Sequence, residues 1–199
     1  MLKHPLKRLI GARGFTLIEL MVVVCIFAIL LLLAVPGLQE WVGRASVRAA
    51  IEDVQNAMQI AQAEAAKRNQ HVEFALFAEH PAPNASNILN TAATANGVHW
   101  AVRVLPTTGS DKEFVQKGNF KSRRVKVTGD ASIVFNGLGQ TLSAPSKYLT
   151  TTKVYRVTTQ SDKYPICVFV RPGGGLRWCD PRFSGNPLAC PADITCPAS

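Results

Sequence analysis

The chain has 199 residues, of which 47% are hydrophobic and only 18% are charged. Chains that are disordered throughout combine few apolar residues with a high net charge, so this composition excludes disorder of the whole chain. The formal net charge is +9, and such an excess favours a polyanionic partner, either nucleic acid or an anionic membrane surface. The positive charge lies at the extreme N-terminus and in the C-terminal half, because residues 1–14 hold four basic residues and no acid, and residues 97–199 hold 14 basic residues against 6 acids.

An uninterrupted apolar segment follows the basic leader. It runs from Phe15 to Val35, with Thr16 and Glu19 as its polar residues. As a helix it is about 31 Å long, close to the thickness of a bilayer's hydrocarbon core, and it is too long for the apolar region of a secretory signal peptide. Because cytoplasmic flanks of membrane helices carry Lys and Arg, we expect residues 15–36 to cross the inner membrane once and residues 37–199 to lie in the periplasm.

The start of this segment carries a recognisable motif. The sequence Arg13-Gly14-Phe15-Thr16-Leu17-Ile18-Glu19-Leu20 resembles the class III signal of type IV pilins and of type II secretion pseudopilins. The resemblance implies that a prepilin peptidase removes residues 1–14 by cleaving after Gly14, and that the new N-terminal Phe15 is N-methylated. The family's acidic residue at the fifth mature position falls on Glu19, and its helix-loosening proline falls on Pro36.

Glu19 allows two interpretations. A carboxylate inside an apolar membrane helix is costly and by default marks a function, whereas a carboxylate near the helix end can reach the interface. The resemblance favours the first. Cleavage leaves a positive amine on Phe15, and Glu19 of a neighbouring subunit would neutralise it in the apolar core of a filament, where opposite charges attract strongly. Glu19 would thereby set the register between subunits.

The helical pattern continues after Pro36, so that we expect one helix of over fifty residues. Its second half is amphipathic over about residues 41–69, with Asn69 as the expected stop. Apolar and small residues recur there at the spacing of one buried face. This predicted face comprises Val47, Ala50, Ile51, Val54, Ala57, Met58, Ala61 and Ala65.

Residues 71–199 show the patterns of strands and turns. The segment 97–105 alternates, with Trp100 and Val102 on one face and His99 and Arg103 on the other, which predicts a half-buried strand. Residues 81–96 and 106–120 are expected to be loops. Further strands are expected at 71–78, 123–128, 132–135, 153–159, 166–171 and 176–179.

One long helix followed by strands predicts an α+β fold, with the helix packed on an antiparallel sheet. The segment Ile133-Val134-Phe135-Asn136-Gly137-Leu138-Gly139 and the last hairpin with its cysteines resemble the β-region of minor pilins of the GspH, FimT and FimU group. The resemblance implies the pilin fold.

Four of the five cysteines follow the predicted membrane helix, whereas Cys25 lies within it. In an oxidising compartment Cys167, Cys179, Cys190 and Cys196 are expected to form disulfides, with three possible pairings. A hairpin centred on Gly173 places Cys167 opposite Cys179, which favours that pair together with Cys190–Cys196. A zinc site of four thiolates is the alternative, although the spacing lacks a CxxC pair.

Basic residues form two clusters that are candidates for binding DNA. One comprises Arg123, Arg124 and Lys126, and the other comprises Arg171, Arg177 and Arg182. Clustered cations bind phosphates, but a charge run is also typical of a solvated face. Some FimT-type pilins bind DNA and carry Gly-Arg-x-Arg before the C-terminal Cys. Here Arg177 matches the second Arg of that motif, while Gly175 replaces the first.

The sequence contains no G-x-S-x-G, H-E-x-x-H, Walker A or dinucleotide fingerprint, so we expect no enzyme, cofactor or metal. The combined resemblance implies a minor type IV pilin, a filament subunit that primes pilus assembly or lies at the tip. The expected partners are other major and minor pilins, the prepilin peptidase and the inner membrane, with DNA as a candidate. A DNA-binding pilin and a minor pseudopilin of a type II secretion system are the alternatives.

Overall fold

The computed structural model describes residues 14–79, 91–105, 112–120, 124–144 and 147–198, and only the backbone of 33–36. The chain divides into two compact units, Met1–Trp41 and Val42–Ser199, and we call the second the head. Among the described residues no single helix meets the criteria of length and hydropathy for a membrane span. The helical segments Leu17–Leu32 and Gly37–Arg68 meet them together, as a bent pair, by length and composition alone.

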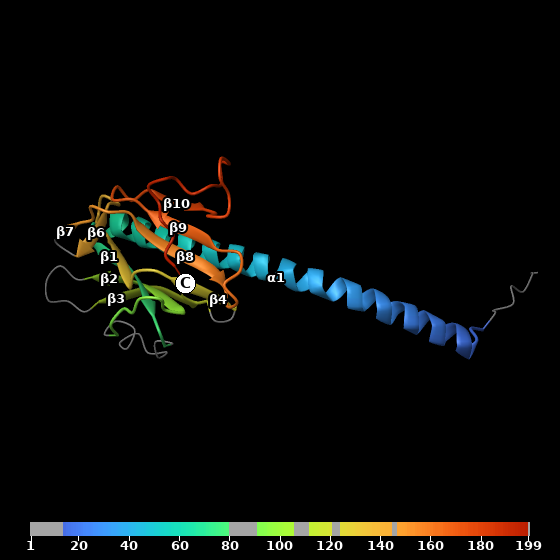
Figure 1. Cartoon of the computed structure of the whole chain (residues 1–199). Coiled ribbons are helices and arrows are strands. Elements are labelled where there is room, and N and C mark those ends of the chain that lie inside the picture. Colours follow the sequence, from blue (N-terminus) through green and yellow to red (C-terminus); the bar gives the residue numbers. More distant parts are fainter. Residues whose placement is uncertain (1–13, 80–90, 106–111, 121–123, 145–146, 199) are drawn as a thin grey trace, which may run out of the picture. The chain divides into compact units, whose positions relative to one another are not determined.

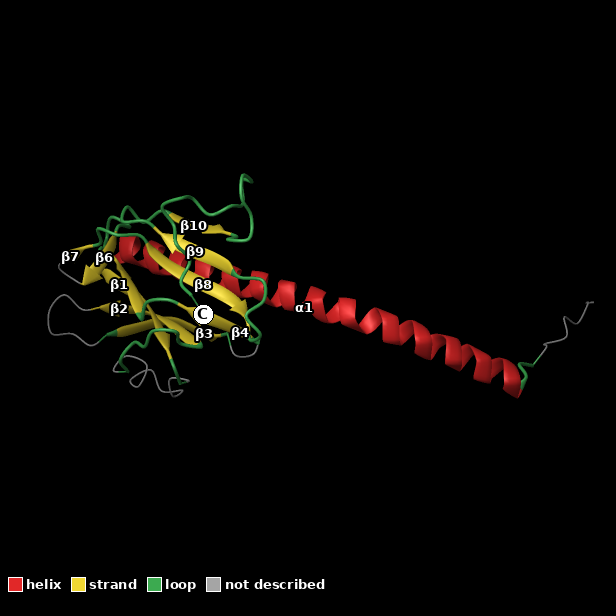
Figure 2. Cartoon of the chain, in the orientation of Figure 1, coloured by secondary structure: helices red, strands yellow, loops and turns green. Residues whose placement is uncertain are grey.

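Helix α1 extends from Leu17 to Arg68 and is 52 residues long, which confirms the predicted long helix (Figure 2). Its end lies where the sequence predicted it. Asn69 adopts φ +51°, and the N–H of Gln70 donates to the carbonyl of Ala65 at 3.2 Å. This bond, made by the second residue beyond the helix, satisfies the carbonyl of Ala65 in the last turn.

The head contains two antiparallel sheets beside the C-terminal half of α1 (Figure 1). The six-stranded sheet has the order β3-β2-β1-β5-β6-β7, and the four-stranded sheet has the order β10-β9-β8-β4. The α+β class is therefore confirmed, with two sheets where one was expected. The strands are β1 (His71–Phe77), β2 (His99–Leu105), β3 (Glu113–Asn119), β4 (Val125–Thr128), β5 (Ser132–Phe135), β6 (Thr141–Ala144), β7 (Lys147–Tyr148), β8 (Lys153–Thr159), β9 (Ile166–Val170) and β10 (Leu176–Cys179).

One hydrophobic core joins α1 to both sheets. All eight residues of the predicted helix face are buried in it. In Figure 1, β8 and β9 lie across the C-terminal half of the helix. The sheets contribute alternate side chains, as the period of a strand requires. From the sheets the core takes Val72, Phe74, Leu76, Trp100, Val102, Ile133, Phe135, Val125, Val127, Tyr155, Val157, Val168 and Val170.

Two expectations about the strands were wrong. Residues 113–119 were expected to be part of a loop but form β3, which pairs with β2 at the edge of the larger sheet. Strand β2 was expected to be half-buried, yet both of its faces are covered. Its outer face carries Arg103, which is buried and forms an ion pair of 2.6 Å with Glu73 on β1.

The hydroxyl of Tyr155 on β8 has no hydrogen-bond partner among the described residues. The side chain is completely buried, and its ring packs edge-on against Phe74 with 6.0 Å between the centroids. Burial, together with the nearby carboxylates of Asp130 and Glu73, raises the pKa of Tyr155 far above its ordinary value of 10.0. The folded head therefore keeps this hydroxyl neutral.

Replacing Tyr155 by phenylalanine should remove a loss of stability at alkaline pH. Above about pH 10 the tyrosine ionises in the unfolded chain but not in the fold, so its contribution to stability falls by about 1.4 kcal/mol per pH unit. Tyr155→Phe should remove this loss and should not reduce stability at neutral pH, because no hydrogen bond is lost. Urea unfolding at pH 7 and at about pH 11 measures both effects, with Tyr148→Phe, an exposed site, as the control. A clear destabilisation of Tyr155→Phe at pH 7 would show that the hydroxyl has a partner.

Candidate functional site

The N-terminal end of α1 holds Glu19 in a capping arrangement with Thr16. Glu19 Oε2 accepts hydrogen bonds from the backbone N–H and the hydroxyl of Thr16, both at 3.3 Å. In return, the backbone N–H of Glu19 donates to Thr16 Oγ1 at 3.3 Å. A Thr followed three residues later by Glu is a capping box, in which each side chain satisfies a free N–H of the first turn. The carboxylate therefore lies beside the first turn of the helix, near Phe15.

The apolar side chains of the N-terminal unit are exposed within the structure. The large apolar residues described between Phe15 and Leu32 are 50–83% exposed. Gly14 has open space around it, since nothing lies within 4 Å of the position that a Cβ would occupy. Pro36 lies within the helix as a backbone position. Such a continuous apolar surface is far larger than soluble monomers expose, which indicates that a membrane or other subunits cover it.

The hairpin of β9 and β10 has the predicted register. Cys167 lies opposite Cys179, and Val168 lies opposite Trp178. The turn is closed by the N–H of Gly174, which donates to the carbonyl of Arg171 at 2.8 Å. Gly174 itself adopts φ +84°, as the last residue of a three-residue hairpin loop requires.

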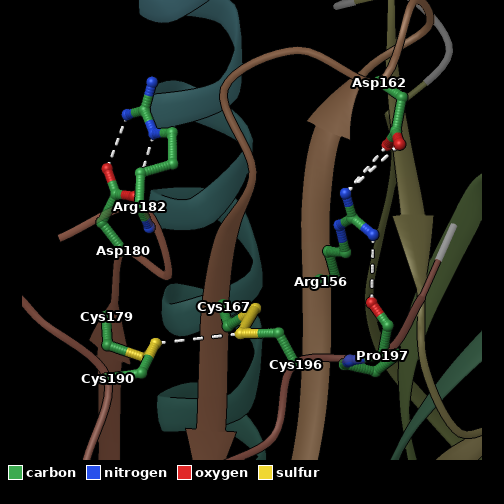
Figure 3. Close-up of a disulfide and its surroundings, with 9 residues drawn as sticks. All are labelled: Arg156, Asp162, Cys167, Cys179, Asp180, Arg182, Cys190, Cys196 and Pro197. Carbon is green, nitrogen blue, oxygen red and sulfur yellow. Dashed lines mark hydrogen bonds and ion pairs between the residues drawn. A yellow bond between two sulfur atoms is a disulfide. The ribbon is translucent and has the colours of Figure 1, made fainter. Parts of the chain in front are cut away.

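The preferred disulfide pairing was wrong. The structure joins Cys167 to Cys196 and Cys179 to Cys190, so each strand of the hairpin is bonded to the C-terminal segment and not to the other strand (Figure 3). The four sulfurs are thus used in disulfides rather than as the thiolates of a zinc site. Cys25, in the N-terminal unit, is a free thiol.

The C-terminal strap, which we define as residues 180–198, covers the outer face of the smaller sheet. Its Ile194 is buried in a cluster with Phe169 and the disulfides. Near its end, Arg156 Nη1 donates to the carbonyl of Pro197 at 3.1 Å (Figure 3). Asp193 forms an ion pair of 3.3 Å with Arg171. These noncovalent contacts explain why the cysteines of the strap bond to cysteines of the sheet. No local sequence pattern predicted the contacts.

The candidate DNA-binding residues do not gather at one edge of the smaller sheet. Arg124 and Lys126 lie at β4, whereas Arg177 lies on β10, and these are the two outer strands of the smaller sheet. Three strand spacings, about 14 Å, separate such strands in the plane of a sheet. Arg123 lies outside the described residues.

Arg182 is engaged within the head. Its Nε and Nη2 donate to the carboxylate of Asp180 at 3.0 and 2.6 Å (Figure 3), and its guanidinium lies 5.5 Å from the ring centroid of Tyr164. Burial raises the pKa of Asp180, but the hydrogen bonds from Arg182 outweigh burial and hold the pKa below its ordinary value. With Arg171 paired to Asp193, much of the positive charge around the hairpin is already balanced.

Two sequence models match the chain. The model of the prokaryotic N-terminal methylation motif matches residues 11–35. The model of the type II transport protein GspH matches residues 50–174, which is more than half of the chain. The chain belongs to the GspH family. The resemblance to type IV pilin-like minor pilins of the GspH, FimT and FimU group is thereby confirmed.

Solved structures similar to this GspH-family chain include two crystal forms of the type IV minor pilin FimU of Pseudomonas aeruginosa PAO1. Both are 12% identical to it. They cover 67% and 66% of this chain and 88% and 90% of their own, with TM-scores of 0.48 and 0.45. No curated protein sequence matches the chain.

Proposed function

We propose that this GspH-family chain is a minor type IV pilin, a structural subunit and not an enzyme, that primes assembly of the filament or lies at its tip. The prepilin peptidase cleaves after Gly14, and Phe15 becomes the N-methylated terminus. Residues 15–36 hold the subunit in the inner membrane, with the head in the periplasm, until it enters the filament. Its partners there are other major and minor pilins.

The observation that carries this proposal is the first turn of α1. A methylation motif leads directly into an apolar helical surface, and the carboxylate of Glu19 is held by Thr16 at the end where cleavage would create an amine. A carboxylate satisfied by a capping box is less costly in an apolar environment than a bare one. It remains able to attract the amine of a neighbouring subunit.

Two alternatives concern the head. The family's description as a type II transport protein supports a minor pseudopilin of a secretion system, whereas the two disulfides incline us towards a pilus. DNA binding rests on Arg177, which is exposed, and on the next residue of β10, Trp178, which is 39% exposed and has a ring that can stack on a base. We rank DNA binding below filament assembly, because the basic residues divide between two edges of the smaller sheet and two of them, Arg171 and Arg182, are paired with carboxylates.

The proposal predicts that two substitutions block two different steps. Gly14→Trp should prevent cleavage, because a tight subsite cannot hold the ring. Glu19→Gln should be cleaved normally but should enter filaments at least about tenfold less, since it keeps the cap but loses the charge that pairs with the amine. Mass spectrometry of the full-length protein from membranes measures cleavage, and quantitative immunoblots of sheared filaments measure incorporation.

Thr16→Val is the matched control, because it removes the capping hydroxyl and keeps the carboxylate. Normal incorporation of Glu19→Gln would contradict the assembly role of Glu19, and normal cleavage of Gly14→Trp would contradict the processing site. Deletion of the chain from its host should reduce surface pili and leave protein secretion intact. The reverse pattern would assign it to a secretion pseudopilus.

A further inference from the structure

The two disulfides of the head lie in contact with each other. Cys190 Sγ is 3.8 Å from Cys196 Sγ, although these residues are not bonded to one another (Figure 3). The sulfurs of Cys179, Cys190 and Cys196 all lie within 4.8 Å of one another. Cys167 and Cys179 are directly opposite in the hairpin register. Opposed residues of antiparallel strands have Cα atoms about 4.5–5.5 Å apart, within the range that a disulfide spans.

We propose that the head exchanges its disulfides between two pairings. In the nested pairing, which the structure shows, Cys167–Cys196 encloses Cys179–Cys190 and the strap is bonded to the sheet. In the sequential pairing, Cys167–Cys179 joins β9 to β10 and Cys190–Cys196 closes a loop within the strap. The sequential pairing releases the strap from the sheet without any net oxidation or reduction.

The exchange needs one external thiolate, which acts as a catalyst. It attacks Cys190, which is partly exposed whereas Cys179 is buried, forms a mixed disulfide there and displaces the thiolate of Cys179. That thiolate attacks Cys167 on the opposite strand, forms Cys167–Cys179 and displaces the thiolate of Cys196. The thiolate of Cys196 then attacks Cys190 and returns the external thiolate. Two disulfides exist before and after, and each displaced sulfur is the next nucleophile.

The two pairings are favoured by different forces. The nested bonds span sequence separations of 29 and 11 residues, whereas the sequential bonds would span only 12 and 6. Shorter loops cost less entropy to close, so the chain alone favours the sequential pairing. The folded strap favours the nested pairing through buried Ile194 and through the contacts of Asp193 and Pro197. A change in the packing of the strap therefore shifts the balance.

Release of the strap would uncover a defined surface on the smaller sheet. The strap now covers Phe169, which is 2% exposed, and packs beside Val154. Arg171 and Arg177 flank these apolar side chains on the same face, because Phe169 pairs with Arg177 in the hairpin register. The exchange thus converts a closed face of the head into an apolar surface bordered by arginines.

Tryptic peptides of the full-length protein distinguish the two pairings. Because Arg171 precedes a proline, trypsin should release 164–177 with Cys167, 178–182 with Cys179, and 183–199 with both other cysteines. The nested pairing links all three peptides. The sequential pairing links the first two and leaves the third internally bonded. In detergent, with a mixture of reduced and oxidised glutathione followed by an acid quench, we expect the sequential products to appear without free thiols. The proposal is overturned if only the three-peptide product and fully reduced peptides are found.

Substitutions in the strap provide the second measurement. Ile194→Ala should raise the ratio of sequential to nested pairing by at least about tenfold, since a buried isoleucine contributes more than that factor requires. Thr195→Ala, at an exposed neighbouring position, is the control and should leave the ratio unchanged. The double variant Cys190→Ser with Cys196→Ser should form Cys167–Cys179 in oxidised glutathione. Persistent free thiols in that variant would overturn the proposal independently of how the strap folds.

Discussion

Replacing Arg103 by alanine should lower the free energy of unfolding of the head by about 3–5 kcal/mol. The Arg103 and Glu73 side chains are only 4% and 10% exposed, and Nε lies 2.6 Å from the carboxylate. Arg103 Nη1 also donates to the carbonyl of Thr91 at 2.8 Å, and the guanidinium lies 5.5 Å from the ring centroid of Phe77. Removing the guanidinium leaves the Glu73 carboxylate buried without its ion-pair partner and frees the space beside the ring.

Chemical denaturation of the wild type and the variant measures this loss. The exposed pair of Lys67 and Glu64 supplies the control, because the Lys67 side chain is 74% exposed and Lys67→Met should change stability by less than about 1 kcal/mol. The double variant Glu73→Leu with Arg103→Met should recover most of the loss, since it removes both buried charges together. A single variant as stable as the wild type would mean that water reaches Glu73.

Expectations based on local pattern were confirmed where the local pattern decides the structure. The buried face of α1 follows from residues three and four apart, and its end follows from Asn69, which tolerates the left-handed conformation at φ +51°. The hairpin register also held, because Pro172 and Gly174 occupy the positions that a short hairpin loop prescribes. The capping box at Thr16 and Glu19 was not among the expectations, although a Thr followed three residues later by a Glu is a signature that the sequence displays.

The missed features depend on contacts between distant segments. Strand β3 has exposed and half-buried residues in no strict alternation, so its pairing with β2 rather than its own pattern makes it a strand. From its position in the strand pattern, Arg103 was expected on the solvent-facing side. It instead lies on a covered face, where its guanidinium donates hydrogen bonds to the Glu73 carboxylate and to the carbonyl of Thr91. Sequence alternation predicts which residues share a face and does not predict what covers that face.

The disulfides illustrate the same limit at the candidate site. Cys167 and Cys179 lie opposite each other in the hairpin, as expected, but they are not bonded to each other. The anchors of the strap, Ile194 and the carbonyl of Pro197, bring the last cysteines onto the sheet. The sequence could not predict these anchors, because a single isoleucine and a backbone carbonyl have no sequence signature.

Replacing Gly174 by alanine should destabilise the head by about 3 kcal/mol or more. The left-handed conformation at φ +84° costs a residue with a Cβ about 1–2 kcal/mol. In addition, the Cβ would lie 2.0 Å from the carbonyl oxygen of Gly139 and 2.7 Å from Gln62 Nε2. The backbone cannot yield without loss, because Gln62 Nε2 donates to that same carbonyl at 2.8 Å. The added methyl group would therefore push the β9–β10 turn away from the β5–β6 turn and from Gln62 of α1.

The neighbouring glycines make this prediction selective. Gly173 and Gly175 belong to the same turn, but a Cβ on either would meet nothing within 4 Å, so Gly173→Ala and Gly175→Ala should change stability by less than about 1 kcal/mol. Thermal unfolding under oxidising conditions compares the three variants, and for a domain of this size Gly174→Ala should lower Tm by about 6–12 °C. Equal losses in all three would trace the effect to the general flexibility of the turn. A loss confined to Gly174 and larger than the about 1–2 kcal/mol that the left-handed conformation costs would show that the contact between the two turns and Gln62 stabilises the head.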